Sequence, residues 1–168
     1  MSAVSQSTAN FYTSLITPET VIKVSSTLDK SVGKKNLIDG SPETCWTSQQ
    51  GLPQTITLVF PDTSPSKVII PKLLSLTFQG GFVGSTCAVH VRLREQESVD
   101  KGKVEWTWLG YVYPEDVNRR QTFSLTDLPA DGRDEKNGIT ALRLSFETSS
   151  DFFGRITVYD LSLEGHVT

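Results

Sequence analysis

Residues that most often carry catalysis, metal binding or covalent cross-links are scarce in this sequence. Its 168 residues include 2 cysteines, 2 histidines and 1 methionine. Two cysteines cannot build a disulfide framework, and no cysteine or histidine spacing is typical of a zinc site. His90 has outward parity in an expected strand and His166 lies near the C-terminus, so no Ser/His/Asp or Cys/His catalytic set can be assembled. Because the glycine patterns of nucleotide-binding loops are also missing, we expect a protein that is not an enzyme.

Long apolar runs and strong positive charge are missing as well. No apolar stretch approaches the roughly 18 residues needed to cross a membrane, and residues 1–10 lack the basic and apolar regions of a signal peptide. The formal net charge of -3 argues against a protein that holds nucleic acid by electrostatics alone. We therefore expect a nuclear or cytoplasmic protein that is not secreted and that contacts neither a membrane nor nucleic acid directly.

Alternation of apolar and polar residues is the dominant pattern in the chain. It predicts β-strands, separated by turns rich in glycine, proline and aspartate. The side chains expected to face the core are Ile56, Leu58, Phe60, Val89, Val91, Leu93, Leu142, Leu144 and Phe146. The pattern predicts an all-β fold, either a sandwich or a barrel. We expect one domain over residues 16–168, preceded by a flexible N-terminus at residues 1–15.

Two local irregularities interrupt the alternation. In the last expected strand the phase changes between Val158 and Leu161, which predicts a β-bulge near Tyr159 and Asp160. Pro71 falls inside the apolar segment 66–78. Because proline cannot donate a hydrogen bond to a central strand, we expect a break or an edge position there.

The segment from Asn36 to Ser48, with the sequence NLIDGSPETCWTS, combines a turn with unusual chemistry. Asp39 opens an Asp-Gly-Ser-Pro turn, and Thr44 follows it closely. A carboxylate and a hydroxyl in a tight turn are ligands that a hard cation such as calcium prefers, and Glu164 could supply a further carboxylate. Alternatively, Asp39 caps its own turn with hydrogen bonds to the backbone.

Aromatic residues beside glycines mark two expected loops, at residues 78–84 and 150–155. Apolar side chains at loop tips are one way in which a rigid sandwich contacts its partners. Alternatively, Phe152 and Phe153 turn inward and close the end of the core. Asp151 and Arg155 are spaced so that they could form an ion pair across the second loop.

The chain resembles the discoidin-like domains, also known as galactose-binding-like or coagulation factor V/VIII C-type domains. The resemblance extends from about Glu19 to Gly165 and rests on the segment 34–48 together with the segments 18–26, 76–82 and 146–165. The combination of Glu-Thr-Cys-Trp, Phe-Gln-Gly-Gly-Phe, Tyr-Pro-Glu-Asp and Asp-Phe-Phe-Gly-Arg is similar to a family of small nuclear-receptor-associated proteins within that group.

The resemblance implies an antiparallel β-sandwich, a discoidin-like jelly roll of roughly eight strands. It also implies that this domain is an intracellular interaction module that is not catalytic. It implies a protein partner, an orphan nuclear receptor whose transactivation the module represses, and hence a role in transcription regulation. It also implies a structural calcium ion between the Asp39 turn and the last strand. Asp39 and Thr44 would then be ligands, Glu164 would close the site, and Asn36 or Ser41 would contribute oxygens.

We expect the partner to bind at one end of the sandwich. The loops 51–54, 80–84 and 151–155 would form this surface, with contacts from Gln79, Phe82, Phe152, Phe153 and Arg155. One alternative is a carbohydrate-binding module of the galactose type, which would need Trp46, Trp106 or Trp108 to be exposed. Another is a discoidin-like subunit of a ciliary transport assembly.

Overall fold

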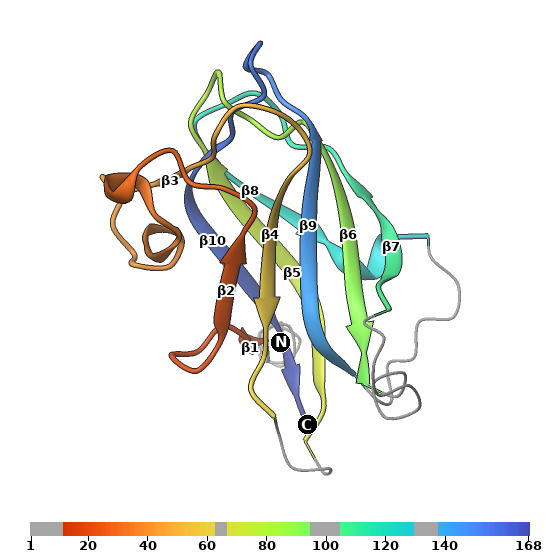
Figure 1. Ribbon diagram of the computed structural model, residues 1–168. Helices are drawn as coiled ribbons and strands as arrows, with labels where there is room; N and C mark the ends of the chain where they lie inside the picture. The colour runs from red at the N-terminus through yellow and green to blue at the C-terminus, as the bar shows by residue number, and fades with distance from the viewer. Residues whose placement is uncertain (1–11, 63–66, 95–104, 130–137) are drawn as a thin grey trace, which may run out of the picture.

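The chain folds into two antiparallel β-sheets that pack face to face (Figure 1). The computed structural model describes residues 12–62, 67–94, 105–129 and 138–168. One sheet has the order β1 (Thr13–Ser14), β10 (Thr157–Val167), β5 (Ile69–Phe78) and β8 (Arg120–Ser124), with β3 (Trp46–Thr47) also paired to β10. The other has the order β2 (Val21–Val24), β4 (Gln54–Val59), β9 (Ile139–Thr148), β6 (Thr86–Leu93) and β7 (Thr107–Val112). Three short 3-10 helices are η1 (Lys30–Val32), η2 (Lys34–Leu37) and η3 (Leu125–Asp127).

The core lies between the two sheets and confirms the predicted all-β sandwich. All nine side chains predicted to face inward are buried. The rings of Phe78 from β5 and Phe146 from β9 meet edge to face across the core, with their centroids 5.7 Å apart. Within the described ranges eight strands have four or more residues, and β1 and β3 add two short ones. None of the described helices is long and apolar enough to span a membrane.

The predicted bulge in β10 is confirmed. Val158 pairs with Phe78 on β5, whereas Asp160 pairs with Thr77, so one residue of β10 is left over between them. The extra residue reverses the face of the sheet to which alternate side chains point. Val158 and Leu161 therefore both reach the core although they are three residues apart.

Of the two outcomes predicted for Pro71, the break does not occur, because β5 runs without interruption from Ile69 to Phe78, whereas the edge position is confirmed. Its ladder with β8 covers only Leu73–Thr77, so the missing N–H of Pro71 interrupts no pairing on that side. On the other side Pro71 faces Gly165, next to a second register shift. A Cβ at Gly165 would lie 2.0 Å from the Ile70 carbonyl oxygen, so the absent side chain is what lets the two backbones approach.

The described part of the predicted N-terminal segment is integrated into the sandwich. Thr13 and Ser14 pair with Gly165 and Glu164, and Leu15 is buried in the core. Residues 1–11 lie outside the described residues. Since β1 lies against the end of β10, the first and last described strands meet at the lower end of the view in Figure 1.

Candidate functional site

Four loops gather at the opposite end of the sandwich, at the top of Figure 1, and we call this surface the loop end. They are the β3–β4 loop (48–53), the β5–β6 loop (79–85), the β7–β8 loop (113–119) and the β9–β10 loop (149–156). Hydrogen bonds join these loops to one another. The links are Gly51 N–H to the Phe153 carbonyl (2.9 Å), Val83 N–H to the Ser150 hydroxyl (2.9 Å), Ser150 N–H to the Val83 carbonyl (2.9 Å), Gly81 N–H to the Asp116 carboxylate (2.8 Å) and Gly80 N–H to the Asn118 side-chain oxygen (2.6 Å).

The predicted ion pair between Asp151 and Arg155 holds the β9–β10 loop. Arg155 Nε donates to Asp151 Oδ2 at 2.9 Å and Nη2 donates to Oδ1 at 3.2 Å. The backbone N–H of Arg155 also donates to Oδ2, at 3.0 Å. These hydrogen bonds lower the pKa of Asp151 below its usual value and raise the pKa of Arg155. Both groups therefore stay charged at neutral pH, and the planar guanidinium is fixed in one orientation.

Aromatic rings surround this guanidinium. Its central carbon lies 5.2 Å from the centre of the Phe82 ring and 5.7 Å from that of Phe153. Phe152, at the tip of the loop, is 93% exposed, and Phe153 is 53% exposed. The alternative in which these two rings close the core is therefore wrong. The structure brings Phe82, Phe153 and Arg155 together and leaves Phe152 projecting beside them.

Gln79 is half-buried, and its backbone helps to fix the β5–β6 loop. Its N–H donates to the Thr157 carbonyl oxygen (3.1 Å), and its own carbonyl accepts from the Phe82 N–H (3.0 Å). The sequence argument missed Asp116 and Asn118, whose side chains accept hydrogen bonds from the backbone of the β5–β6 loop. No local pattern signals these two roles, because donors and acceptors lie more than thirty residues apart.

The Asp39 segment lies outside the loop end and forms a closed turn. Asp39 accepts hydrogen bonds from the Ser41 N–H (3.0 Å) and from the Thr44 hydroxyl. The Thr44 bond, followed by the Ser41 bond, lowers the pKa of Asp39. This is the capped turn that was one of the two sequence interpretations. Trp46 follows it into the core with 0% exposure, and its indole N–H donates to the Ser26 carbonyl oxygen (3.0 Å).

The five predicted calcium ligands are brought together only in part. Asn36 lies near the turn, but its amide nitrogen already donates to the carbonyls of Ser31 (3.0 Å) and Cys45 (2.9 Å). Glu164 is paired with Ser14 on β1, four residues beyond Asp160 and therefore roughly 13 Å farther along the strand. Calcium takes about six to eight oxygen ligands. No group of three or more His, Cys, Asp or Glu side chains suited to a metal occurs within the described ranges. The arrangement fits a hydrogen-bonded turn better than a calcium cage.

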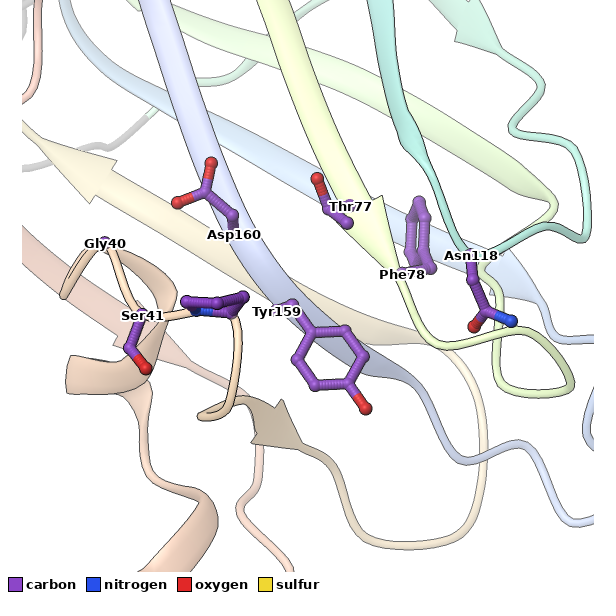
Figure 2. A pocket seen from close by; sticks show the side chains of 8 residues that line it. Gly40, Ser41, Thr77, Phe78, Asn118, Tyr159 and Asp160 are labelled. Atoms are coloured by element: carbon purple, nitrogen blue, oxygen red, sulfur yellow. The ribbon is translucent and has the colours of Figure 1, made fainter.

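A shallow cleft of about 440 Å³ separates this turn from the sheet. Figure 2 shows Gly40 and Ser41 facing Tyr159 and Asp160 of β10, with Asn118 on the far side. Burial raises the pKa of Asp160; the Arg120 charge opposes this shift and the Asp39 charge adds to it. Asp160 lines the cleft together with Gly40 and Ser41, whereas Glu164 lies four residues farther along β10, beside Ser14.

The tryptophans required by the sugar-binding alternative differ in exposure. Trp46 is buried, Trp106 is half-buried, and Trp108 is 42% exposed on β7, away from the loop end. The exposed aromatic side chains at the loop end are thus Phe152, Phe153 and Tyr113 of the β7–β8 loop.

Comparison with known proteins identifies the family. The chain is 36% identical over 156 residues to the nuclear receptor 2C2-associated protein of Xenopus tropicalis, covering 91% of this chain and 98% of that protein. It is 38% identical to the Danio rerio protein of the same name over 158 residues, covering 90% and 95% of the two chains. The chain belongs to the nuclear receptor 2C2-associated protein family. No family model matches the sequence.

Solved structures share the β-sandwich fold of this chain. A family 32 carbohydrate-binding module of Clostridium perfringens NanJ, in complex with galactose, matches with a TM-score of 0.65 over 92% of this chain and 99% of the module, at 15% identity. A chitosan-binding module from Paenibacillus sp. IK-5 matches with a TM-score of 0.61 over 86% of this chain and 94% of the module, also at 15% identity. At this identity the similarity concerns the fold.

Proposed function

We propose that this protein is a non-catalytic interaction module that binds a nuclear receptor through its loop end. The relatives' shared name supports a receptor as the partner. The observation that carries the proposed surface is Phe152, which is 93% exposed and whose ring centre lies 5.2 Å from that of Phe153, one of the two rings beside the Arg155 guanidinium. Aromatic and arginine side chains dominate the binding energy of many protein interfaces.

The geometry of the loop end favours tight contact at small entropic cost. Interloop hydrogen bonds and the Asp151–Arg155 pair hold the rings in place before a partner arrives. A surface that is ordered in advance loses little conformational freedom on binding. Burying the Phe152 side chain against a partner would contribute about 1.5–3 kcal/mol.

The proposal is tested by binding of the purified protein to immobilised nuclear receptor 2C2 of Xenopus tropicalis, followed by surface plasmon resonance. Phe152→Ala is expected to weaken binding at least about tenfold, as the loss of roughly 1.5–3 kcal/mol predicts. Tyr12→Ala is the matched control, because Tyr12 is a partly exposed aromatic residue that packs against His166 at the opposite end.

Equal affinities of wild type and Phe152→Ala would exclude the loop end as the binding surface. Binding weakened equally by both substitutions would exclude it too. Absence of any wild-type binding would remove the receptor as partner. In a reporter assay for the receptor, repression of transactivation that is lost with Phe152→Ala would support the proposed role in transcription regulation.

A sugar of the galactose type is the second candidate ligand. It is favoured by the fold shared with a galactose-binding module and by an exposed ring next to a planar guanidinium at the loop end. Isothermal titration with galactose tests it. Measurable heat that Arg155→Ala abolishes would support sugar binding, and titrations without heat at millimolar galactose would remove it.

A further inference from the structure

The outer face of the sheet β2-β4-β9-β6-β7, which faces the viewer in Figure 1, carries a row of polar and aromatic side chains. The strand register aligns one residue from each strand. The row runs Lys23, Thr57, Arg143, His90 and Trp108, each directly paired with the next. Neighbouring strands lie about 4.8 Å apart, so these side chains adjoin one another on a single surface.

Two guanidinium groups on this face are held by one indole. The central carbon of Arg143 lies 4.3 Å from the centre of the Trp106 ring, and that of Arg92 lies 5.1 Å from the same ring. Arg143 is fixed further by its Nε, which donates to the Thr57 hydroxyl at 2.9 Å. Contact with an aromatic face orients a guanidinium and leaves its outer N–H groups free to bind an acceptor.

This cationic pair lacks a counterion among the residues that the structure describes. Neither Arg92 nor Arg143 forms a salt bridge with a described carboxylate. Burial and then the neighbouring Arg92 charge lower the pKa of Arg143. The pKa of His90 is lowered by burial and by Arg143. Two buried nitrogen atoms, His90 Nδ1 and Arg92 Nε, have no hydrogen-bond partner within the described ranges.

An aromatic edge borders the arginines. Trp108 and Tyr111 meet edge to face with centroids 5.6 Å apart, and Tyr111 stacks on Tyr113 at 6.1 Å. All three rings are exposed, Tyr113 by 65%. Glu147 lies beside this edge and accepts a hydrogen bond from the Tyr111 hydroxyl (3.4 Å). Arginine, tryptophan and tyrosine are the residues most enriched at interface hot spots.

We propose that the face formed by Arg92, Trp106, Trp108, Tyr111 and Arg143, the sheet face, docks an acidic segment of a protein partner. Carboxylates of that segment would bind the two guanidinium groups, and an adjacent apolar side chain would pack on Trp108 and Tyr111. A nucleic acid would need a larger basic surface, and the net charge of -3 works against it. The sheet face is separate from the loop end, so this inference does not depend on the identity of the receptor.

The probe is a fluorescein-labelled peptide of alternating glutamate and serine with one central phenylalanine. The control peptide has glutamine in place of every glutamate. Binding is followed by anisotropy and by the indole N–H signals of ¹⁵N-labelled protein. Trp46 is the internal reference among the 3 tryptophans, because it is buried and bonded to Ser26. We expect the glutamate peptide to shift the signals of Trp106 and Trp108 and to leave that of Trp46 unchanged.

Charge variants separate specific docking from general attraction. Arg143→Gln is expected to weaken the glutamate peptide roughly tenfold, as for the loss of a charge-assisted hydrogen bond. Arg119→Gln removes the same charge from an exposed residue paired with Glu115 and is expected to have little effect. Phe152→Ala, at the loop end, should bind the peptide as the wild type does. An unchanged Trp46 signal shows that each variant is folded.

Several results would overturn the proposal. These are equal affinity for the glutamate and glutamine peptides, equal weakening by Arg143→Gln and Arg119→Gln, and peptide-induced shifts that spare Trp106 and Trp108. Tighter binding of an oligothymidylate that shifts the same two indole signals would assign the face to nucleic acid instead.

Discussion

Trp46 and Phe152 are both large aromatic residues in segments rich in turns, yet they serve opposite purposes. Trp46 is buried and bonded through its N–H to Ser26, so it joins the Asp39 turn to the core. Phe152 is almost wholly exposed at the tip of its loop. One side chain therefore bears on the stability of the fold, while the other is available for recognition.

Trp46→Phe is expected to lower the free energy of unfolding by about 2–4 kcal/mol. The smaller ring leaves a cavity in the core and deprives the Ser26 carbonyl of its donor. Urea denaturation at neutral pH measures the change. Trp108→Phe, on the exposed edge of the sheet face, should alter stability far less. Equal losses in the two variants would contradict this account of Trp46.

The Asp151–Arg155 pair should make stability depend on pH at the acidic end. Because hydrogen bonds from Arg155 lower the pKa of Asp151 in the folded state, the carboxylate stabilises the fold above its unfolded pKa of 3.8. That contribution is lost as the pH falls through the lower, folded pKa. Asp151→Asn should therefore be less stable than wild type at pH 7 and approach it near about pH 2. Urea melts at several pH values test this, and a difference that grows toward acid would refute it.

The Asp39 turn is the element on which the calcium prediction rests. An ion bound at Asp39 and Thr44 would favour the folded state by mass action and so raise the melting temperature. Calcium chloride should then stabilise the wild type, and chelator should reverse the effect. Asp39→Ala should melt lower and respond to neither, because it lacks both the carboxylate and the turn hydrogen bonds.

The Asp160→Asn variant tests whether Asp160 or Glu164 is the carboxylate of β10 that acts together with the Asp39 turn. If the ion is held between the turn and β10 near Asp160, this variant should also lose its response to calcium, while Glu164→Gln should keep it. If neither calcium nor chelator changes the melting temperature of the wild type, the ion is ruled out. The segment then serves only as a hydrogen-bonded turn.

Features confined to one segment could be predicted from the sequence. The phase change in β10 is visible in the spacing of Val158 and Leu161, and the Asp151–Arg155 pair follows from residues four apart. Features that depend on strands far apart in the sequence could not be predicted in this way. β5 continues through Pro71 because Gly165, on another strand, leaves room for its backbone. The alignment of Arg143 with His90 depends on the same kind of long-range register.

The molecule as a whole combines a net charge of -3 with a local pair of arginines that form no ion pair with a described carboxylate. Overall charge therefore predicts little about which partner each surface prefers. The relatives are matched over nearly their entire length, 98% for the Xenopus tropicalis protein, so the chain described here corresponds to almost the whole of that protein. Within it, the loop end and the sheet face can be altered separately, because none of the residues that define them is common to both.

The pairing of β1 with the end of β10 also determines where a label or a solid support can be attached without covering the loop end. Thr13 lies beside Gly165, and the eight residue steps of β10 from Gly165 back to Thr157 extend roughly 26 Å toward the loop end. A fluorophore, affinity tag or solid support attached at Tyr12 or Thr168, the first and last described residues, is thus held at the end of the domain away from Phe152. Immobilisation on a sensor chip through either of these positions leaves the loop end facing the solution. Only a tether long enough to fold back over the domain would obstruct the loop end.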